Sequence, residues 1–308
     1  MDIIGKRYWY FALSFFLIVP GMILLAIKGL PLAIDFTGGS MLEVSFDSGK
    51  APAAADVIAM YADLGIEDVQ VQTSGNNILI IRSPFLSDEL SAKVVPAMES
   101  TFNDKVTVRQ YDSVGPTVGK EVAGRAAGAV ALSAIIVVLF ITYSFRGVEH
   151  AFRYGVCAIA ALLHDILVAI SLITVGAHYW GWQVDSLCLT ALLTVIGFST
   201  QDTIVVFDRI RENSRIYRKL PFEKLVNHSV VQTLQRSINT QLMTVEFMLL
   251  ALVLFGGVTL RQFCLILLVG LLSGSYSSIF TAAPVLVVWE QKEWRTWFKR
   301  GPKTTQPA

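Results

Sequence analysis

Ionisable side chains interrupt the long apolar stretches of this sequence at five positions. They are His164, Asp165, Asp202, Arg236 and Glu246. A charge within a membrane-spanning segment is costly, so such residues usually pair with one another or line an ion pathway. These five side chains are the first candidates for a function, and the chemistry open to them is the binding and release of protons.

Asp202 and Arg236 form the most informative pair. The predicted topology places them at the same depth, in the cytoplasmic halves of neighbouring spans. A guanidinium favours the charged form of a carboxyl and apolar surroundings favour its neutral form, so a carboxyl under both influences can titrate. Proton relay is one interpretation of the pair, and a buried salt bridge that holds two helices together is the other.

Further polar residues could extend this pair into a seam between helices. Ser199 lies three residues before Asp202 and shares its helical face. Glu246 lies on the same flank of its span as Arg236, where it could join the seam or compete with Asp202 for the guanidinium. We predict a proton pathway that contains Asp202, Arg236, Ser199, Glu246 and Asp165.

His164 and Asp165 are adjacent, and adjacent residues point about 100° apart on a helix. They need not act together, and a role in packing or in holding helices together remains open for both. An intramembrane aspartyl protease would need a second aspartate to meet Asp202, and Asp165 is the one candidate for it.

Other catalytic and metal-binding motifs are missing from the sequence. It has no glycine-rich phosphate loop, no Gly-x-Ser-x-Gly elbow and no His-Glu-x-x-His motif. The three cysteines lie in apolar stretches, at spacings that fit no zinc site. We therefore expect a protein that is not an enzyme, with no catalytic residue, no metal and no cofactor.

The elements that position these side chains are six predicted membrane spans. Of 308 residues, 54% are hydrophobic and only 16% are charged, whereas soluble proteins have about 25% charged residues. A spanning helix needs about 20 mostly apolar residues. Such stretches run from Tyr8 to Ile27, Arg125 to Phe145, Ala151 to Ala177, Leu187 to Phe207, Ser237 to Phe255 and Gln262 to Trp289. The first is interpreted as an uncleaved anchor, since no small-residue cleavage site follows it.

Lysine and arginine in the short connections predict the orientation of the spans. They cluster before the first span, after the second and the fourth, and in the tail, while the connection 178–186 has none. Both termini are thus predicted to be cytoplasmic, in a multi-pass protein of the inner membrane. The net charge of +1 gives no global field that would bind nucleic acid.

Residues 35–122 are predicted to form one extracytoplasmic domain between the first and second spans. The sequence favours strands at Met41–Phe46, Asp68–Thr73, Asn77–Arg82 and Val106–Gln110, with helices at Ala51–Leu64 and Ser87–Phe102. The two middle strands are joined by Ser-Gly-Asn-Asn, which indicates a hairpin. The order βαββαβ is typical of the ferredoxin-like α+β fold.

The remaining segments complete the expected domain organisation. Residues 1–34 hold the first span, residues 123–290 form a five-helix membrane region, and residues 291–308 form a cytoplasmic tail. Within the membrane region, the polar and basic stretch 208–235 is interpreted either as an amphipathic interfacial helix broken before Pro221 or as a solvated loop.

Several motifs, in order along nearly the whole chain, resemble the SecF family of protein-export membrane subunits. They are Ile-Asp-Phe-Thr-Gly-Gly at 34–39, Val-Gly-Pro-Thr-Val-Gly at 114–119, His164-Asp165, the run Gly-Phe-Ser-Thr-Gln-Asp that opens 197–213, and Gln-Thr-Leu-Gln-Arg-Ser-Ile-Asn-Thr at 232–240. The resemblance implies half of a resistance-nodulation-division transporter fold, a six-helix bundle with the outer domain inserted in it. It also implies use of the proton-motive force to complete the export of preproteins.

The resemblance also implies partners and residue roles. The chain lacks the SecD half, so we expect SecD as a separate partner, together with the SecYEG channel, YajC and a translocating preprotein. By motif, Asp202 is the membrane carboxylate of the proton pathway and Arg236 is its basic companion. Glu246 departs from the family pattern, in which this position is apolar or small.

The glycine-containing motifs lie at the two junctions between the spans and the outer domain. Asp35, Gly38 and Gly39 follow the first span, and Gly115 and Pro116 precede the second. Glycine adopts backbone angles that other residues resist, so each junction could be a hinge or a tight turn. For the whole protein, the alternatives are a passive scaffold of the translocon or half of a small-molecule exporter.

Overall fold

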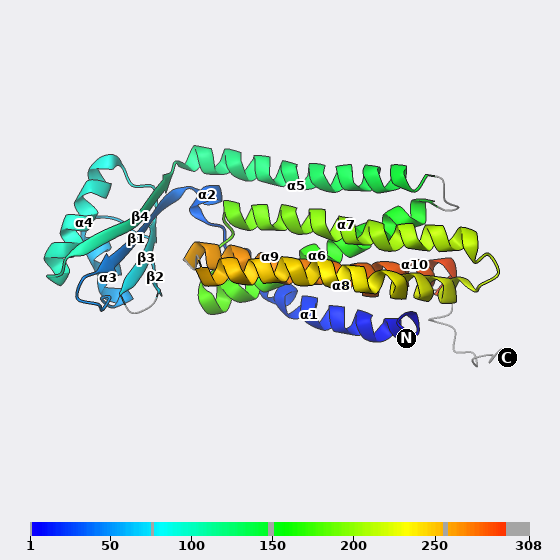
Figure 1. Ribbon diagram of the computed structural model, residues 1–308. Helices are drawn as coiled ribbons and strands as arrows, with labels where there is room; N and C mark the ends of the chain where they lie inside the picture. The colour runs from blue at the N-terminus through cyan, green and yellow to red at the C-terminus, as the bar shows by residue number, and fades with distance from the viewer. Residues whose placement is uncertain (1, 75–76, 147–150, 255–257, 294–308) are drawn as a thin grey trace. The chain divides into compact units, whose positions relative to one another are not determined.

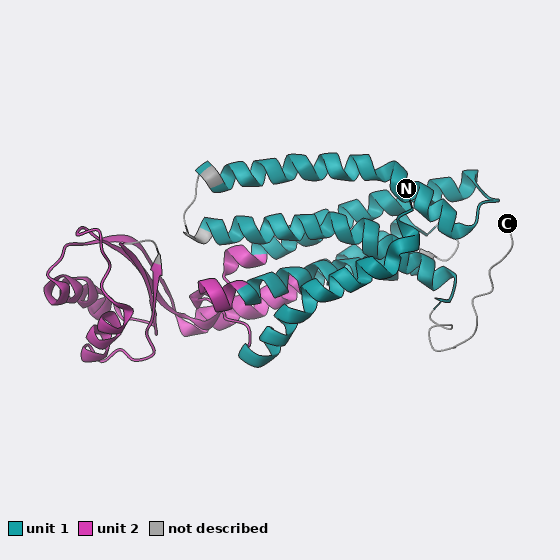
Figure 2. Cartoon of the chain, turned by 90° about the horizontal axis from the view of Figure 1, so that it is seen from below, with its two compact units in different colours: residues 1–28, 131–175, 190–308 teal, residues 29–130, 176–189 magenta. Residues whose placement is uncertain are grey.

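The computed structural model describes residues 2–74, 77–146, 151–254 and 258–293 (Figure 1). Its helical elements are a 3-10 turn (Ile4–Lys6), α1 (Arg7–Lys28), α2 (Ile34–Thr37), α3 (Ala54–Asp63), α4 (Asp88–Phe102), α5 (Pro116–Ser144), α6 (Ala151–Trp180), α7 (Ser186–Ile216), α8 (Phe222–Leu254), α9 (Val258–Ser277), a π-helical turn (Ser278–Ala282) and α10 (Ala283–Glu290). Its strands are β1 (Gly39–Phe46), β2 (Gln70–Ser74), β3 (Ile78–Ser83) and β4 (Val106–Val114). The chain divides into two compact units (Figure 2): unit 1 comprises 1–28, 131–175 and 190–308, and unit 2 comprises 29–130 and 176–189.

Long apolar helices account for most of the predicted spans. Within the described residues, five stretches are long and apolar enough to cross a membrane: Ile4–Lys28, Pro116–Ser144, Phe152–Trp180, Ser186–Ile216 and Leu260–Glu290. They contain the first, fourth and sixth predicted spans, and they cover the second and third except for one terminal residue each. The predicted fifth span falls in α8, and its last residue, Phe255, lies outside the described residues. Five of the six predicted spans are thus supported by length and composition.

Several of these helices extend beyond their predicted ends. α5 begins at Pro116, because proline suits the first position of a helix, where its missing N–H leaves no hydrogen bond unmade. The stretch 208–235, expected as an interfacial helix broken before Pro221 or as a loop, is divided between the end of α7 and the start of α8, with residues 217–221 between them. Its apolar residues Ile210, Val226 and Val230 are each 0% exposed. They pack the two helices together instead of lying on a membrane surface.

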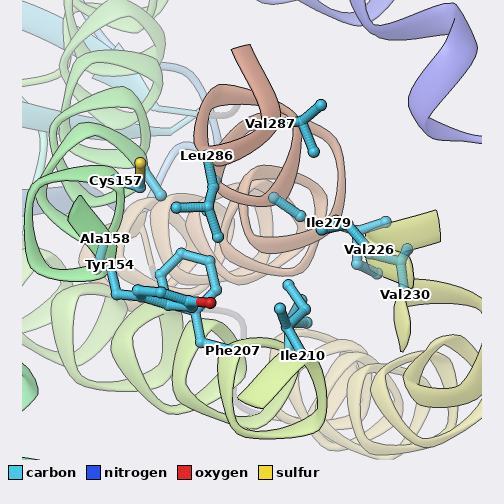
Figure 3. Close-up of a cluster of buried hydrophobic side chains, with 14 of the residues drawn as sticks. Tyr154, Cys157, Ala158, Phe207, Ile210, Val226, Val230, Ile279, Leu286 and Val287 are labelled. Atoms are coloured by element: carbon cyan, nitrogen blue, oxygen red, sulfur yellow. The ribbon is translucent and has the colours of Figure 1, made fainter. Parts of the chain in front are cut away.

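A buried apolar cluster joins five helical elements within unit 1 (Figure 3). It includes Tyr154, Cys157 and Ala158 of α6, Phe207 and Ile210 of α7, Val226 and Val230 of α8, Ile279 of the π-helical turn, and Leu286 and Val287 of α10. The rings of Tyr154 and Phe207 meet edge to face with their centroids 5.3 Å apart. This packing fixes the rotation of each helix, and hence the direction in which its polar residues point.

Glycines bring α9 into close contact with α7. A Cβ added to Gly270 would lie 2.3 Å from Val195 Cγ2, and one added to Gly274 would lie 3.2 Å from Ser199 Cα. A side chain at Gly270 would therefore force the two helices apart. Two small residues spaced four positions apart on a membrane helix, as Gly270 and Gly274 are, favour close packing of this kind.

Unit 2 contains a four-stranded antiparallel sheet in the order β2-β3-β1-β4. Along the chain its elements follow the order β1-α3-β2-β3-α4-β4, as the sequence predicts, and the hairpin residues 75–76 lie outside the described residues. Its core contains Val44 and Leu79 from the sheet and Val57 and Met98 from the helices, all 0% exposed. β4 continues to Val114, so the sheet reaches almost to the start of α5.

Candidate functional site

Asp165, on α6, is held by a cage of hydroxyl groups and is only 1% exposed. Ser199 Oγ of α7 donates to Asp165 Oδ2 at 2.5 Å. From α9, Ser277 Oγ donates to Oδ2 at 2.7 Å and Ser273 Oγ donates to Oδ1 at 2.6 Å. His164 Nδ1 lies 3.1 Å from Oδ1. Short hydrogen bonds of this type stabilise a charged carboxylate, so this residue ties three helices together.

His164 extends the same network to α1. Its Nε2 lies 2.9 Å from Ser14 Oγ. Ser14 Oγ in turn donates to Tyr276 Oη at 3.3 Å, and that hydroxyl donates to the carbonyl oxygen of Tyr10 at 2.8 Å. The sequence left open whether the adjacent residues His164 and Asp165 act together. In the structure their side chains contact each other directly and belong to one hydrogen-bond network.

Asp202, on α7, has a much sparser environment than Asp165. It is partly buried, and Ser275 Oγ of α9 donates to its Oδ2 at 2.5 Å. Ser275 Oγ also lies 2.9 Å from Gln241 Oε1 of α8. No second hydrogen bond to the Asp202 carboxyl occurs within the part of the chain that the structure describes. A carboxyl with a single donor can exchange its proton at a lower cost than one with three.

The structure does not bring Asp202 and Arg236 into a direct ion pair. No nitrogen–oxygen contact within 4.0 Å joins them in the described ranges, although Arg236 is near enough for its charge to act on Asp202. Arg236 is exposed and lines a cavity of ≈ 330 Å³ between α7 and α8. The other residues that line the cavity are Val205, Asp208, Arg209, Glu212, Gln232 and Thr233. The guanidinium therefore faces a polar cavity, and a serine hydroxyl occupies the place beside the carboxyl.

Two further predicted members of the pathway lie apart from Asp202. Ser199 shares a helical face with Asp202, as expected, but its hydroxyl serves Asp165. Glu246 is exposed on α8 beside the exposed apolar residues Met243 and Phe247. Glu246 makes no ion pair with Arg236 among the described residues, so it does not extend the seam within this chain.

Sequence reasoning missed the serines of α9, which serve both carboxyls. Ser273 and Ser277 are four residues apart and face Asp165, while Ser275, between them, faces Asp202. The run Ser-Gly-Ser-Tyr-Ser-Ser at 273–278 inside an otherwise apolar span was the available signal. Serine hydroxyls in a span often bond to the helix's own carbonyl groups, so the run alone did not identify their partners.

The predicted junction residue Asp35 contacts the start of α7, within unit 2. Asp35 Oδ2 accepts a hydrogen bond from Ser186 N at 2.8 Å and another from the Ser186 hydroxyl. Nearby, Ala33 N donates to Val184 O and Val184 N donates to Pro31 O, each at 2.8 Å. A carboxylate at the first free N–H groups of a helix satisfies them and complements the helix dipole. Asp35 thus caps a helix that begins 151 residues later.

The junction glycines lie in tight backbone contacts. Gly38 has φ +77°, and a Cβ added to it would lie 2.6 Å from Pro116 Cα. Gly39 has φ +136°, and a Cβ added there would lie 2.8 Å from the carbonyl oxygen of Ser83. Gly115, in contrast, has open space around it. Close packing and left-handed backbone both require glycine at 38 and 39, which favours the tight-turn interpretation at these positions.

A half-buried acid and a half-buried base, Asp185 and Arg82, lie near the Asp35 cap. Burial raises the pKa of Asp185, and the Asp35 carboxylate adds to this effect, whereas the N–H of Cys188, which donates to Asp185 at 2.7 Å, opposes it. Burial lowers the pKa of Arg82 on β3, and the charge of Asp185 opposes that shift. Strand β3 of the sheet is thereby linked by opposite charges to the connection between α6 and α7.

Comparison with known proteins relates the whole chain to protein-export subunits. Residues 93–292 match the family "protein export membrane protein SecD/SecF, C-terminal", and residues 23–50 match the SecD/SecF GG motif, which includes Gly38 and Gly39. Protein translocase subunit SecF of Anaerolinea thermophila is 66% identical, with 98% of each chain covered. Protein translocase subunit SecF of Thermobaculum terrenum is 42% identical, with 97% of each chain covered.

A solved structure has the same fold. The crystal structure of SecDF from Thermus thermophilus, described as a translocon-associated membrane protein, superposes with a TM-score of 0.82 at 29% identity. The match covers 94% of this chain but only 39% of that one. The chain therefore corresponds to a little over a third of that protein.

Proposed function

This chain belongs to the SecD/SecF family of protein-export membrane proteins, and we propose that it is a SecF subunit of the Sec translocase that uses the proton-motive force to drive late translocation. On this proposal it works with SecD, on preproteins leaving the SecYEG channel, and in association with YajC. Its membrane region is half of a resistance-nodulation-division fold, with six spans if α8 is counted. Unit 2 carries a ferredoxin-like domain outside the inner membrane, and both termini are cytoplasmic.

The contrast between the surroundings of Asp165 and Asp202 supports proton coupling at Asp202. Asp165 has three hydroxyl donors and little exposure, and such a residue is suited to hold α6, α7 and α9 together. Asp202 has one hydroxyl donor and is only partly buried. We assign the titrating role to Asp202 and the helix-holding role to Asp165. A transmembrane potential supplies about 2.3 kcal/mol per charge per 100 mV, enough to bias such a step.

We assign the cavity lined by Arg236 to the cytoplasmic end of the proposed proton pathway. The cavity is lined by charged and polar side chains of α7 and α8 and lies along α7 from Val205 to Glu212, just beyond Asp202. We assign to Arg236 an electrostatic influence on Asp202 across this space, in place of a direct salt bridge. Ser199 contributes indirectly through Asp165, and Glu246 faces outward, where a partner helix or lipid would meet it.

The junction residues connect this machinery to the outer domain. α7 is one continuous helix that begins at the residue capped by Asp35 and also carries Asp202. Gly38 packs tightly against Pro116, and Gly39 packs tightly against Ser83. We therefore assign Gly38 and Gly39 the role of a rigid connection and not of a flexible hinge. Movement of the outer domain would then follow movement of α7.

Asp202→Asn tests the proposal. Purified chain and SecD, reconstituted with the channel, are assayed for release of a preprotein after ATP is exhausted, with and without a pH gradient. We expect the gradient-dependent release to be lost in Asp202→Asn and kept in the matched variant Glu121→Gln, which removes an exposed carboxylate from another helix, α5. Gradient-dependent release that persists in Asp202→Asn would refute proton coupling at this residue.

The same assay separates the motor from a passive scaffold. Gly270→Val introduces a clash with Val195 on α7 and leaves every ionisable group in place. A scaffold predicts full release in Asp202→Asn and loss in Gly270→Val, because only the packing would matter. The motor predicts loss in Asp202→Asn even when the variant inserts and binds SecD normally.

A further inference from the structure

Ser275 stands between two acceptors. Its hydroxyl lies 2.5 Å from Asp202 Oδ2 and 2.9 Å from Gln241 Oε1. A serine hydroxyl has a single hydrogen, so it cannot donate to both at once. At the same time, Gln241 Nε2 is buried and has no hydrogen-bond partner among the described residues. An unpartnered buried N–H group costs free energy. We therefore expect the arrangement in which Gln241 Oε1 faces Ser275 to suit only one protonation state of Asp202.

Rotating the Gln241 amide by a half turn gives a second arrangement. Nε2 then donates to Ser275 Oγ, and the Ser275 hydroxyl donates to Asp202. Glutamine is suited to both arrangements because its side chain carries a donor and an acceptor of similar shape. In this arrangement, with the amide rotated, both hydrogen bonds donate in the direction of Asp202, which fits a charged carboxylate. The reverse chain, in which a protonated Asp202 donates to Ser275 and Ser275 donates to Gln241 Oε1, fits a neutral one.

We propose that Ser275 and Gln241 form a reversible hydrogen-bond relay that stabilises Asp202 in both its charged and its protonated state. This inference rests on the proposed function, and it adds two positioning residues on α9 and α8. Each change of charge on Asp202 reverses the direction of two hydrogen bonds, the one between Asp202 and Ser275 and the one between Ser275 and Gln241.

The position of Ser275 is fixed by its neighbours on α9. Ser273 and Ser277, on either side of it, bond to Asp165 on α6. Gly274 lies against the Ser199 backbone of α7. The hydroxyl of Ser275 is thus held within reach of Asp202 whichever way it points. The charged groups that act on Asp202 from the surrounding helices are Asp165 of α6 and Arg236 of α8.

Infrared titration of the purified chain with SecD in nanodiscs tests the relay. The carbonyl band of protonated Asp202, identified by its loss in Asp202→Asn, is followed against pH. In Ser275→Ala we expect the midpoint of this band to rise by about one pH unit, a tenfold change in proton affinity. The reason is that hydrogen bonds to charged groups are about twice as strong as neutral ones, so the charged form loses more. Gln241→Met should shift the midpoint in the same direction by less, since Gln241 acts through Ser275.

Two further variants separate the relay from simple packing. Ser275→Thr keeps the hydroxyl and should restore the midpoint. Thr244→Ala, one turn from Gln241 on α8, removes a hydroxyl that bonds to the Thr240 carbonyl of its own helix and should leave the midpoint unchanged. An unchanged midpoint in both Ser275→Ala and Gln241→Met, with the Asp202 band intact, overturns the relay alone. A chain without any band that depends on Asp202 overturns both the relay and the proposed titration of Asp202.

Discussion

Replacement of Asp165 by asparagine should lower the stability of the membrane region substantially. The two side chains have nearly the same shape, so the packing is kept, but the charge is lost and one acceptor oxygen becomes an NH2 group, toward which a serine hydroxyl must turn its oxygen. A hydrogen bond to a charged group contributes about 1.5–3 kcal/mol and a neutral one about 0.5–1.5 kcal/mol, so each serine bond weakens by about 1 kcal/mol. Three serine hydroxyls donate to Asp165, which gives a loss of about 3 kcal/mol.

Thermal unfolding of the purified protein in nanodiscs measures this loss, with the fluorescence of its six tryptophans as the signal. At about 2–4 °C per kcal/mol, the midpoint should fall by roughly 6–12 °C. Asp202→Asn, in which one serine bond is affected, serves as the comparison and should lower the midpoint by about a third as much. Ser273→Ala should cost less in the Asp165→Asn background than in the wild type, because the two residues interact.

An unchanged midpoint in Asp165→Asn would contradict this reasoning. It would mean that Asp165 is already neutral in the folded protein, so that asparagine replaces a carboxylic acid with three neutral hydrogen bonds. The distinction between a charged Asp165 that holds helices and a titrating Asp202 would then fail, and the assignment of roles in the proton pathway would have to be reversed or shared.

Two other changes test unit 2. Asp35→Ala removes one of the two carboxylates that accept N–H groups of the first turn of α7, the other being Asp185, and should destabilise this turn by about 1 kcal/mol. Faster hydrogen exchange at the Ser186 amide measures this, and exchange equal to that of the wild type would show that Asp35 contributes nothing. Asp104 accepts hydrogen bonds from the Ser48 hydroxyl and N–H, which lower its pKa. That stabilisation is present above the unfolded pKa and is lost as the pH falls through the lower folded value, so protection from exchange near Ser48, taken relative to the intrinsic exchange rate at each pH, should fall below about pH 4. Asp104→Asn should abolish this acid dependence, and a variant that keeps it would point to another carboxyl.

The elements of unit 2 were predictable because short alternating strands and amphipathic helices carry a strong local signal. The helix from Ala54 to Asp63 and the strand from Gly39 to Phe46 lie within a few residues of their predicted bounds. The contact between Asp35 and Ser186 was not predictable, since it joins residues 151 positions apart. A glycine-containing motif next to an aspartate suggests a hinge or a turn, but only a partner far along the chain decides between them.

The expected pair of Asp202 and Arg236 shows why the site was predicted only in part. Hydropathy and the positive-inside rule give the depth of a residue in the membrane, and both residues were assigned to the same depth on that basis. They do not give the rotation of each helix, which depends on packing such as that of Gly270 and Gly274 against α7. With that packing in place, the hydroxyl of Ser275 lies next to the Asp202 carboxyl, and Arg236 lines a cavity between α7 and α8. Ionisable residues are rare in spans and can be found by inspection, whereas the hydroxyl that serves each of them is determined by the rotation of a third helix and requires coordinates.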